Sequence, residues 1–319
     1  MWLGIDVGGS KLALALADGA NAPLRASRRQ AWTPSGDAAR DVALLVAEAR
    51  RLLDGEGGAA LRALGVCAPG PLDSQAGIVH GPPNLPGWRD VPLVSWLERE
   101  FGCAVALEND ANAAALAEWQ ARTPRPASLV YLTLSTGVGA GLVLDGRLYR
   151  GAHDLAGEVG HAPIVWDGEL CACGLRGCLE AYVGGAAWTR RLRAIAPDTG
   201  RVAALAGGPG AVRPEHVVLA AREGDAFARA ELERWNEHLS HALVAIAFAY
   251  APEVISLGTI ASAAGEALCL APLRSRLAAR VWPRLAGAVR LELRALGEDL
   301  PFRAALAVAE RAASERQGR

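Results

Sequence analysis

Residues 1–17 read MWLGIDVGGSKLALALA, and this stretch decides the fold. One apolar run ends at Gly8 and Gly9, and a second apolar run covers Lys11–Ala17. Two such runs joined by a glycine turn predict a β-hairpin. Glycine also lets backbone N–H groups approach an anion that side chains would keep away. The turn leads into a strand and matches neither the Walker pattern nor the Rossmann fingerprint, so it is a candidate phosphate loop of another kind.

The same order of elements returns near residue 138. Leu129–Leu134 predicts a strand, TGVGAG (residues 136–141) a glycine turn, and Leu142–Leu144 another strand. Two halves of similar α/β architecture are therefore expected, joined by the proline-containing stretch Ala121–Ser128. Further strands are expected at Leu24–Ala31, Leu64–Cys67, Ala104–Glu108 and, as the one strand after residue 144, Val254–Leu257; helices are expected at Asp37–Leu53, Val94–Phe101, Ala111–Gln120, Glu215–Arg222, Ala226–Tyr250, Leu268–Leu285 and Ala304–Ala313.

The composition of the 319 residues, with 51% hydrophobic and 21% charged, is that of a globular protein. A net charge of −1, from 33 basic and 34 acidic residues, lacks the basic excess of a nucleic-acid-binding protein. The longest apolar run, Ala242–Ala251, is much shorter than the ~20 residues of a membrane span. The first residues also lack the basic region of a signal peptide. A cytoplasmic protein with no nucleic-acid or membrane partner is expected.

A polar cluster, Glu108-Asn-Asp-Ala-Asn112, follows one of the expected strands. Ligands of α/β folds bind at the carboxyl ends of strands. Asp110 precedes the next helix, and its structural role would be that of an N-cap. Its catalytic role would be to accept the proton of a hydroxyl group that attacks a phosphoryl group. The residues alone leave both interpretations open.

Three cysteines and one histidine form a candidate metal site. GEVGH (residues 157–161) precedes CACGLRGCLE (residues 171–180), and three cysteines with a histidine are a tetrahedral ligand set for zinc. Four ligands leave no open position, so the zinc is expected to be structural. His161 lies near Glu158 and can offer one ring nitrogen to the metal and the other elsewhere. The remaining cysteines, Cys67, Cys103 and Cys269, are expected to be small buried hydrophobic residues.

Taken together, these motifs resemble the ROK family (repressors, open reading frames and kinases). Seven motifs occur in that family's order over residues 1–180: DVGGSK (6–11), PGPLD (69–73), PNLPGW (83–88), ENDAN (108–112), STGVGAG (135–141), EVGH (158–161) and CACGLRGCLE (171–180). The resemblance implies a two-domain actin-like ATPase fold, related to ribonuclease H, whose α/β domains close on ATP and a sugar. The N-terminal domain is expected to comprise residues 1–120 and 301–319, and the C-terminal domain, with the zinc loop, residues 121–300.

The resemblance also assigns roles to individual residues. Asp110 would be the general base, and Asp6 would lie near the magnesium ion. Two departures from the family's pattern are Ser10, in place of threonine, and Thr259, in place of the second of two glycines near the adenosine. The other implied ligands are Asn84, Asn109, Glu158, His161 and Glu180 for the sugar; Gly8, Gly9, Lys11, Thr136 and Gly137 for the phosphates; Gly258 for the nucleotide; and His161, Cys171, Cys173 and Cys178 for zinc.

The activity that the resemblance implies is transfer of a phosphoryl group from Mg-ATP to a hexose, with a structural zinc ion. Glucose, phosphorylated on its 6-hydroxyl in glycolysis, is the first expectation, because PGPLD with Asn84 and Glu180 resembles glucokinase-like members. The alternatives are a kinase of N-acetylmannosamine or N-acetylglucosamine, and a sugar-sensing protein without kinase activity. Repressors of the family carry a helix-turn-helix domain before the first phosphate loop, whereas here that loop begins at residue 6, which favours a kinase. A homodimer or homotetramer is expected.

Overall fold

The computed structural model describes residues 1–56 and 60–317, and the chain forms two compact units. Unit 1 comprises Met1–Arg125, Leu148–Ala156 and the chain from Ala295 onward, and unit 2 comprises Pro126–Arg147 and Gly157–Arg294. This division differs from the expected one at three places: unit 1 continues to Arg125 instead of residue 120, it includes the segment Leu148–Ala156, and it resumes at Ala295 instead of residue 301. Residues 318 and 319 of the expected N-terminal domain lie outside the described residues.

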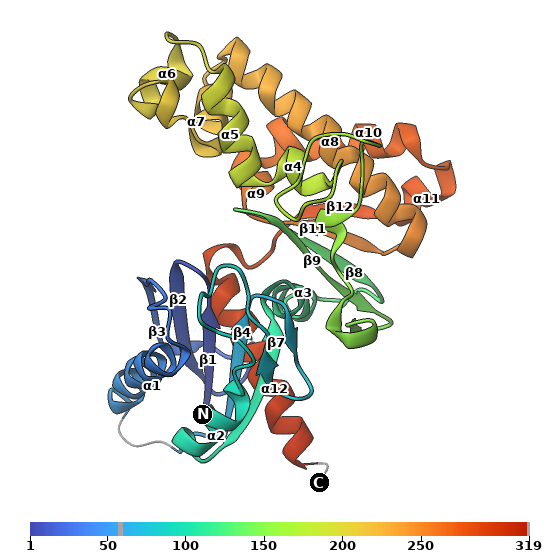
Figure 1. Cartoon of the computed structure of the whole chain (residues 1–319). Helices are drawn as coiled ribbons and strands as arrows, with labels where there is room; N and C mark the ends of the chain where they lie inside the picture. Colours follow the sequence, from blue (N-terminus) through green and yellow to red (C-terminus); the bar gives the residue numbers. More distant parts are fainter. Residues whose placement is uncertain (57–59, 318–319) are drawn as a thin grey trace. The chain divides into compact units, whose positions relative to one another are not determined.

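Unit 1 is built on a five-stranded sheet with the strand order β3-β2-β1-β4-β7 (Figure 1). β1 is antiparallel to β2, which confirms the predicted hairpin, and parallel to β4, which is in turn parallel to β7. The strands are β1 (Trp2–Val7), β2 (Lys11–Ala17), β3 (Leu24–Ala31), β4 (Ala63–Ala68) and β7 (Ala104–Asn109), with a separate pair β5 (Leu72–Asp73) and β6 (Ile78–Val79). The α-helices are α1 (Ala38–Asp54), α2 (Leu93–Phe101), α3 (Asp110–Gln120) and α12 (Leu300–Gln317).

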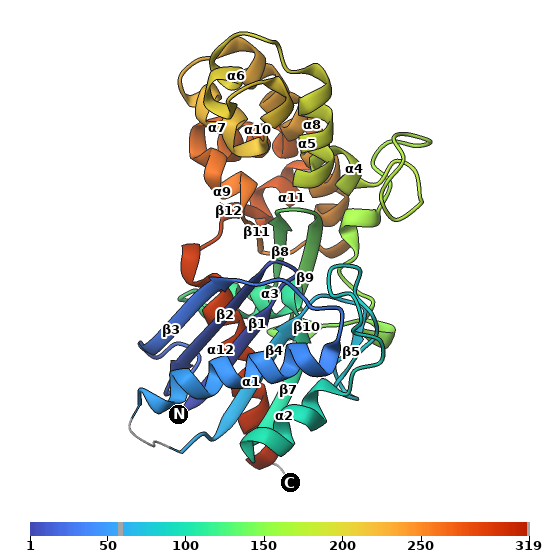
Figure 2. The ribbon, with the colours of Figure 1, turned by 60° about the vertical axis from the view of Figure 1, so that its left-hand side comes forward.

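Alternation of large and small residues in β2 fixes which helix covers each face of this sheet. Its leucines join a core cluster with α1, whereas Ala15 and Ala17 pack with Leu306 of α12. Small residues let α12 approach closely, because a Cβ atom on Gly65 of β4 would lie 2.2 Å from the carbonyl oxygen of Ala305. A helix from the far end of the sequence thus packs on this sheet (Figure 2).

Unit 2 repeats the architecture of unit 1, with the strand order β10-β9-β8-β11-β12. β8 is antiparallel to β9 and parallel to β11, and β11 is parallel to β12, as in the corresponding strands of unit 1. The expectation of a single strand after residue 144 was wrong, because β12 and the short β10 were missed. β12 spans only four residues, of which Leu291 alone is buried, and has no apolar run to mark it. The strands are β8 (Leu129–Leu134), β9 (Val138–Leu144), β10 (Arg147–Tyr149), β11 (Val254–Leu257) and β12 (Arg290–Leu293).

One helix that the sequence predicts as continuous, Leu268–Leu285, is interrupted in unit 2. Between α10 and α11, Val281 and Trp282 are extended, and Pro283 begins α11 without an N–H group to continue the preceding helix. The helices are α4 (Leu179–Val183), α5 (Gly185–Ile195), α6 (Arg201–Ala206), α7 (Pro214–Arg222), α8 (Ala226–Tyr250), α9 (Ile260–Gly265), a π-helical turn (Glu266–Leu270), α10 (Ala271–Arg280) and α11 (Pro283–Ala288).

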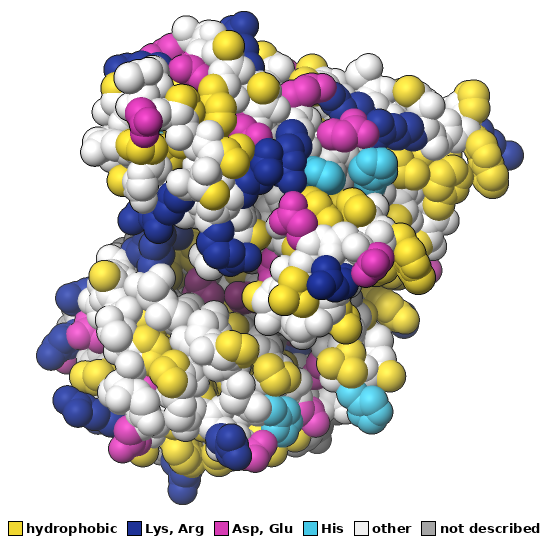
Figure 3. All heavy atoms as spheres, turned by 45° about the horizontal axis from the view of Figure 1, so that its top comes forward, with side chains coloured by type: hydrophobic (Ala, Val, Ile, Leu, Met, Phe, Trp, Pro, Cys, Tyr) yellow, Lys and Arg dark blue, Asp and Glu magenta, His cyan; other side chains and the backbone are white. Residues whose placement is uncertain are grey.

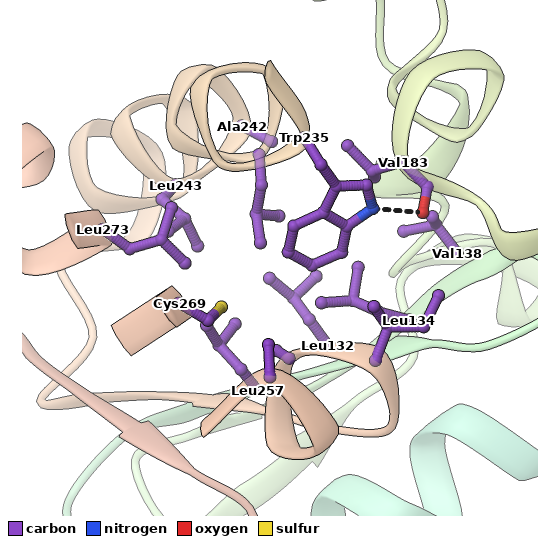
Figure 4. Close-up of a cluster of buried hydrophobic side chains, with 14 of the residues drawn as sticks. Leu132, Leu134, Val138, Val183, Trp235, Ala242, Leu243, Leu257, Cys269 and Leu273 are labelled. Carbon is purple, nitrogen blue, oxygen red and sulfur yellow. Dashed lines mark hydrogen bonds between the residues drawn. The ribbon is translucent and has the colours of Figure 1, made fainter. Parts of the chain in front are cut away.

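The core of unit 2 is centred on Trp235 of α8 (Figure 4). Its indole is fully buried against the sheet, and its Nε1–H donates to the carbonyl oxygen of Val183 at 2.9 Å. Cys269 lies in the same cluster and is fully buried, and Cys67 and Cys103 are buried in unit 1, which confirms the expectation for these cysteines.

The surface mixes charges of both signs. Basic and acidic side chains are interspersed over the face drawn in Figure 3, in keeping with the formal net charge of −1. Among the described residues, no helix combines the length and the apolar character that a membrane crossing requires.

Candidate active site

The first glycine turn is closed by its own backbone and held from the side by a tryptophan. The N–H of Gly8 donates to the carbonyl oxygen of Lys11 at 2.9 Å, and the Nε1–H of Trp32 donates to the carbonyl oxygen of Gly8 at 2.6 Å. A Cβ atom on Gly9 would lie 2.8 Å from Cβ of Asn84. The missing side chain therefore lets a predicted phosphate loop pack directly on a predicted sugar ligand.

The turn that carries Asn84 is anchored by a buried hydrogen bond that sequence reasoning missed. The indole of Trp88 is 1% exposed, and its Nε1–H donates to Asp41 of α1 at 2.9 Å. Asp41 is fully buried and also accepts the N–H of Ser35 at 2.8 Å. The signal in the sequence was an aspartate at a buried position of an amphipathic helix. The anchor leaves Asn84 itself exposed.

Three strands of unit 1 bring their polar residues to one edge of the sheet. In the parallel register, Asp6 of β1 lies opposite Cys67 of β4, and Cys67 lies opposite Glu108 of β7. Asn109, and not Asp110, is the N-cap of α3, because its Oδ1 accepts the N–H groups of the residues at 111 and 112 at 2.9 and 3.2 Å. Asp110 is the exposed first residue of α3. The capping role is therefore filled by its neighbour.

The pKa of Asp6 is unusually high for an aspartate. Burial and the negative charge of Asp110 raise it from 3.8 to about 7, and Arg29 opposes the shift. The charge of Asp110 thus reaches Asp6, so the two carboxylates lie near each other in unit 1. The thiol of Cys67 beside Asp6 has a pKa well above its usual range, mainly because it is buried, so it stays a neutral thiol.

Asp6 gives the fold a specific pH dependence. A carboxyl group whose pKa is higher in the folded state stabilises the fold below its unfolded pKa, and this contribution is lost as the pH rises through the folded pKa. The window therefore runs from pH 3.8 to about 7. Asp6→Asn is expected to be more stable than the wild type at pH 8, by at least ~1 kcal/mol, and about equal at pH 4. Urea unfolding at both pH values measures this, and an equal difference at the two values would contradict the assignment.

Near the carboxyl end of β7, Glu108 is the centre of a hydrogen-bond network that the sequence did not predict. Glu108 is 1% exposed, and its Oε2 accepts from Arg150 at 2.7 and 2.9 Å and from Arg311 at 2.9 Å. Its Oε1 accepts from the Nδ2 of Asn112 at 3.2 Å. The network joins β7, the segment Leu148–Ala156 and α12 at the residue that precedes Asn109 and Asp110 in the sequence. A cavity of about 740 Å³ beside the two arginines contains none of the predicted site residues.

In unit 2, the second glycine turn is held by the start of α5. The N–H groups of Gly185 and Ala186 donate to the carbonyl oxygens of Ser135 and Thr136 at 2.7 and 2.9 Å. Thr136 is exposed. Fixing the carbonyl oxygens from one side is the arrangement expected of a turn that presents its N–H groups to an anion.

Two glycines bring the EVGH motif against β9. A Cβ atom on Gly160 would lie 2.2 Å from the carbonyl oxygen of Val138, and one on Gly157, which has φ +93°, would lie 2.3 Å from that of Ala140. The close approach places Glu158 and His161 beside the strand that begins at the second glycine turn. Glu158 is exposed, and its Oε2 lies 4.0 Å from Nε2 of His161.

The other ring nitrogen of His161 faces the cysteines. Its Nδ1 lies 3.9 Å from Sγ of Cys171, and the Sγ atoms of Cys173 and Cys178 are 3.8 Å apart. Zinc–sulfur bonds of about 2.3 Å in a tetrahedron give sulfur–sulfur distances of about 3.8 Å. All four candidate ligand atoms lie within 4.8 Å of one another, so the set fits a tetrahedral ion such as zinc. Burial is the main cause that raises the pKa of Cys178 to about 12, and a bound metal would have to displace its proton.

At the end of β11, Gly258 and Thr259 have unusual surroundings. Gly258 is buried, and a Cβ atom there would lie 2.2 Å from the hydroxyl oxygen of Tyr131. Thr259 has φ +48° and ψ −104°, a conformation that strongly favours glycine over a β-branched residue. Thr259, which departs from the family's paired glycines, thus has a backbone conformation that favours glycine.

Replacing Thr259 with glycine is therefore expected to stabilise the fold. Relief of backbone strain of this kind stabilises the fold by about 1–3 kcal/mol. The greater conformational entropy of glycine in the unfolded chain opposes this by about 0.5–1 kcal/mol. The melting temperature should rise by about 2–4 °C in differential scanning calorimetry. Thr259→Ala is the control, because it keeps Cβ and should give a smaller gain. An equal gain in both variants would show that strain at φ is not the cause.

The sequence profile of the ROK family matches residues 2–312. The chain belongs to the ROK family. It is 34% identical to a glucokinase of Thermotoga maritima over 300 residues, which are 93% of each chain. It is 28% identical to a ROK family glucokinase of Streptomyces griseus solved in complex with glucose and AMPPNP, with a TM-score of 0.79 over 97% of this chain and 99% of the other.

The ROK family also includes repressors that this chain resembles. A xylose repressor of Caldicellulosiruptor bescii is 32% identical over 205 residues, which are 64% of this chain and 51% of the repressor. Membership of the family, with the likeness to solved ROK kinases, confirms the expected two-domain actin-like ATPase fold.

Proposed function

We propose that this ROK protein is an ATP-dependent glucokinase that transfers the γ-phosphoryl group of ATP to the 6-hydroxyl of glucose. The observation that carries the proposal is the similarity to a glucokinase over 93% of both chains. The chemistry of the described residues agrees with it, since each unit holds a glycine turn beside residues suited to bind sugar hydroxyls.

Asp110 is the proposed general base. An attacking hydroxyl must lose its proton as it bonds to phosphorus, and a carboxylate at the exposed start of α3 can accept that proton. Asn109 is proposed to bind the same sugar. Its Oδ1 is already used to cap α3, so its Nδ2 remains to donate to a hydroxyl oxygen.

The two glycine turns are the proposed phosphate ligands. Gly8 and Gly9 with Lys11, and Thr136 with Gly137, would bind the phosphate oxygens through backbone N–H groups, a hydroxyl and an ammonium group. Magnesium bound with ATP would neutralise phosphate charge, and Asp6 is the carboxylate proposed to lie near it. The remaining work of these residues is to hold the phosphoryl group in line with the hydroxyl.

The metal is proposed to be zinc and to act structurally. With His161 and three cysteines as ligands, no position remains for substrate. The bound ion would fix His161 so that its Nε2, on the side of Glu158, can bind a sugar hydroxyl. The assembly is proposed to be a homodimer or homotetramer, which light scattering on the purified protein would test.

A panel of sugars in an ADP-release assay separates the candidate functions. We expect kcat/KM to be highest for glucose and lower for N-acetylmannosamine, N-acetylglucosamine and xylose. A higher value for either N-acetylhexosamine would assign the protein to those kinases instead. The repressor relatives motivate a third outcome: binding of a sugar, measured by calorimetry, without ADP release from any sugar would indicate a sugar sensor.

A further inference from the structure

Glu180 touches the second glycine turn directly. Its Oε2 accepts the N–H of Val138 at 2.9 Å. A Cβ atom on Gly137 would lie 2.5 Å from the same oxygen, so the carboxylate fills the space that a side chain at 137 would take. Gly137 does not have a positive φ, so its need for glycine comes from this contact. A proposed sugar ligand therefore occupies a backbone donor of a proposed phosphate loop, within one unit.

The turn does not depend on Glu180 for its shape. The N–H of Ser135 donates to the carbonyl oxygen of Gly137 at 3.0 Å, which closes the turn. The first N–H groups of α5 hold the carbonyl oxygens of Ser135 and Thr136 independently. Removing the carboxylate would therefore make one N–H group available and abolish the repulsion between the carboxylate and an anion. The turn itself would stay in place.

The other carboxylate oxygen faces the metal site. Oε1 of Glu180 lies 4.0 Å from Sγ of Cys171, which is the donor in that contact while it is a protonated thiol. A metal-bound cysteine is a thiolate and cannot donate. In the metal-loaded protein, the donors left to Glu180 in this set are the N–H of Val138 and the hydroxyl groups of a bound sugar.

We propose that Glu180 couples the binding of sugar and nucleotide, because its carboxylate can bind either a sugar hydroxyl or the N–H group of Val138. Sugar hydroxyls and the Val138 N–H compete as donors for Oε2 of Glu180, and this oxygen and a phosphate oxygen compete as acceptors for one N–H group. A sugar that draws Glu180 away from the turn exposes the N–H and removes a negative charge from the path of the phosphate. Sugar binding then tightens nucleotide binding, and the effect is reciprocal. The proposal rests on the proposed kinase function and deepens it.

Calorimetric titration of the zinc-loaded protein with Mg-AMPPNP tests this without turnover. In the wild type, saturating glucose is expected to tighten AMPPNP binding about tenfold, within the range usual for coupled sites. Glu180→Ala is expected to bind AMPPNP tightly in the absence of sugar, about tenfold better than the wild type without sugar. Glu180→Gln removes the charge but keeps an acceptor for the N–H group. Its affinity for AMPPNP without sugar is expected to lie between those of the wild type and Glu180→Ala.

Glu215→Ala is the matched control. Glu215 is an exposed glutamate of α7 in the same unit, its printed ion pair is with Arg213, and it lies outside the proposed site, so AMPPNP binding with and without sugar should match the wild type. Weaker or unchanged AMPPNP binding in both Glu180 variants would overturn the coupling and leave the kinase function standing. Absence of AMPPNP binding to the wild type, with and without glucose, would contradict the kinase function as well. Zinc content and melting temperature of each variant establish that it is folded.

Discussion

Replacing Asp110 with asparagine is expected to lower kcat about 10²–10⁴-fold, the usual contribution of a general base. The amide keeps the size of the side chain at the start of α3 but cannot take the proton of the attacking hydroxyl. Asn109 already caps the helix, and the lost charge relieves repulsion of Asp6, so the variant should melt at no lower temperature than the wild type. The KM for glucose should change little, because the proton moves only in the transition state. Steady-state ADP release at saturating ATP measures both constants.

The control for Asp110→Asn is the same substitution outside the site. Asp145 is an exposed aspartate with φ +49° that precedes Gly146 in the turn after β9, where asparagine is equally suited. Asp145→Asn should keep wild-type turnover. A loss of less than about tenfold in Asp110→Asn would place the general base elsewhere.

Loss of the metal is expected to have the second-largest effect. Cys173→Ser removes one of the four proposed ligands, and because structural zinc couples metal binding to folding, the variant should lose the ion together with stability. We expect zinc to fall from about one ion per chain to nearly none, the melting temperature to fall by about 5 °C or more, and turnover to fall more than tenfold. Elemental analysis, calorimetry and the ADP-release assay measure these three quantities.

A neighbouring alanine provides the control for the metal site. Ala172 lies between two proposed ligands in the same loop and is exposed, so Ala172→Ser adds a hydroxyl without removing a ligand. It should keep zinc, stability and activity. Wild-type protein that contains no zinc when purified without chelator would contradict the proposal, as would a Cys173→Ser variant that melts normally and stays active.

Much of the fold could be predicted because its decisive signals are local. The alternation of leucine and alanine in β2 marks both faces of the first sheet, and the observed bounds of β2, β3, β8, α8 and β11 are those expected. The misses have local causes too. The four residues of β12 contain no apolar run that would mark a strand, and Pro283 interrupts the helix that the apolar pattern predicted as continuous.

For the site as well, residues close together in the sequence could be predicted, and contacts between residues far apart in the sequence could not. Motifs indicated the glycine turns, the cluster at 108–112 and the proposed metal ligands, because the members of each set lie within about twenty residues of one another in the sequence. Networks between distant residues were missed: Glu108 meets Arg150 and Arg311 at sequence separations of 42 and 203, and Trp88 meets Asp41 at 47. A single sequence shows that such residues exist but not that folding brings them together.

Analysis of the reaction products tests the proposed activity most directly. Purified protein, incubated with Mg-ATP and glucose, is followed by ³¹P nuclear magnetic resonance. We predict one new phosphomonoester signal, that of glucose 6-phosphate, appearing in equal amount to ADP and absent when glucose is omitted. ADP with inorganic phosphate in place of a sugar phosphate, or no consumption of ATP at all, would contradict a glucokinase.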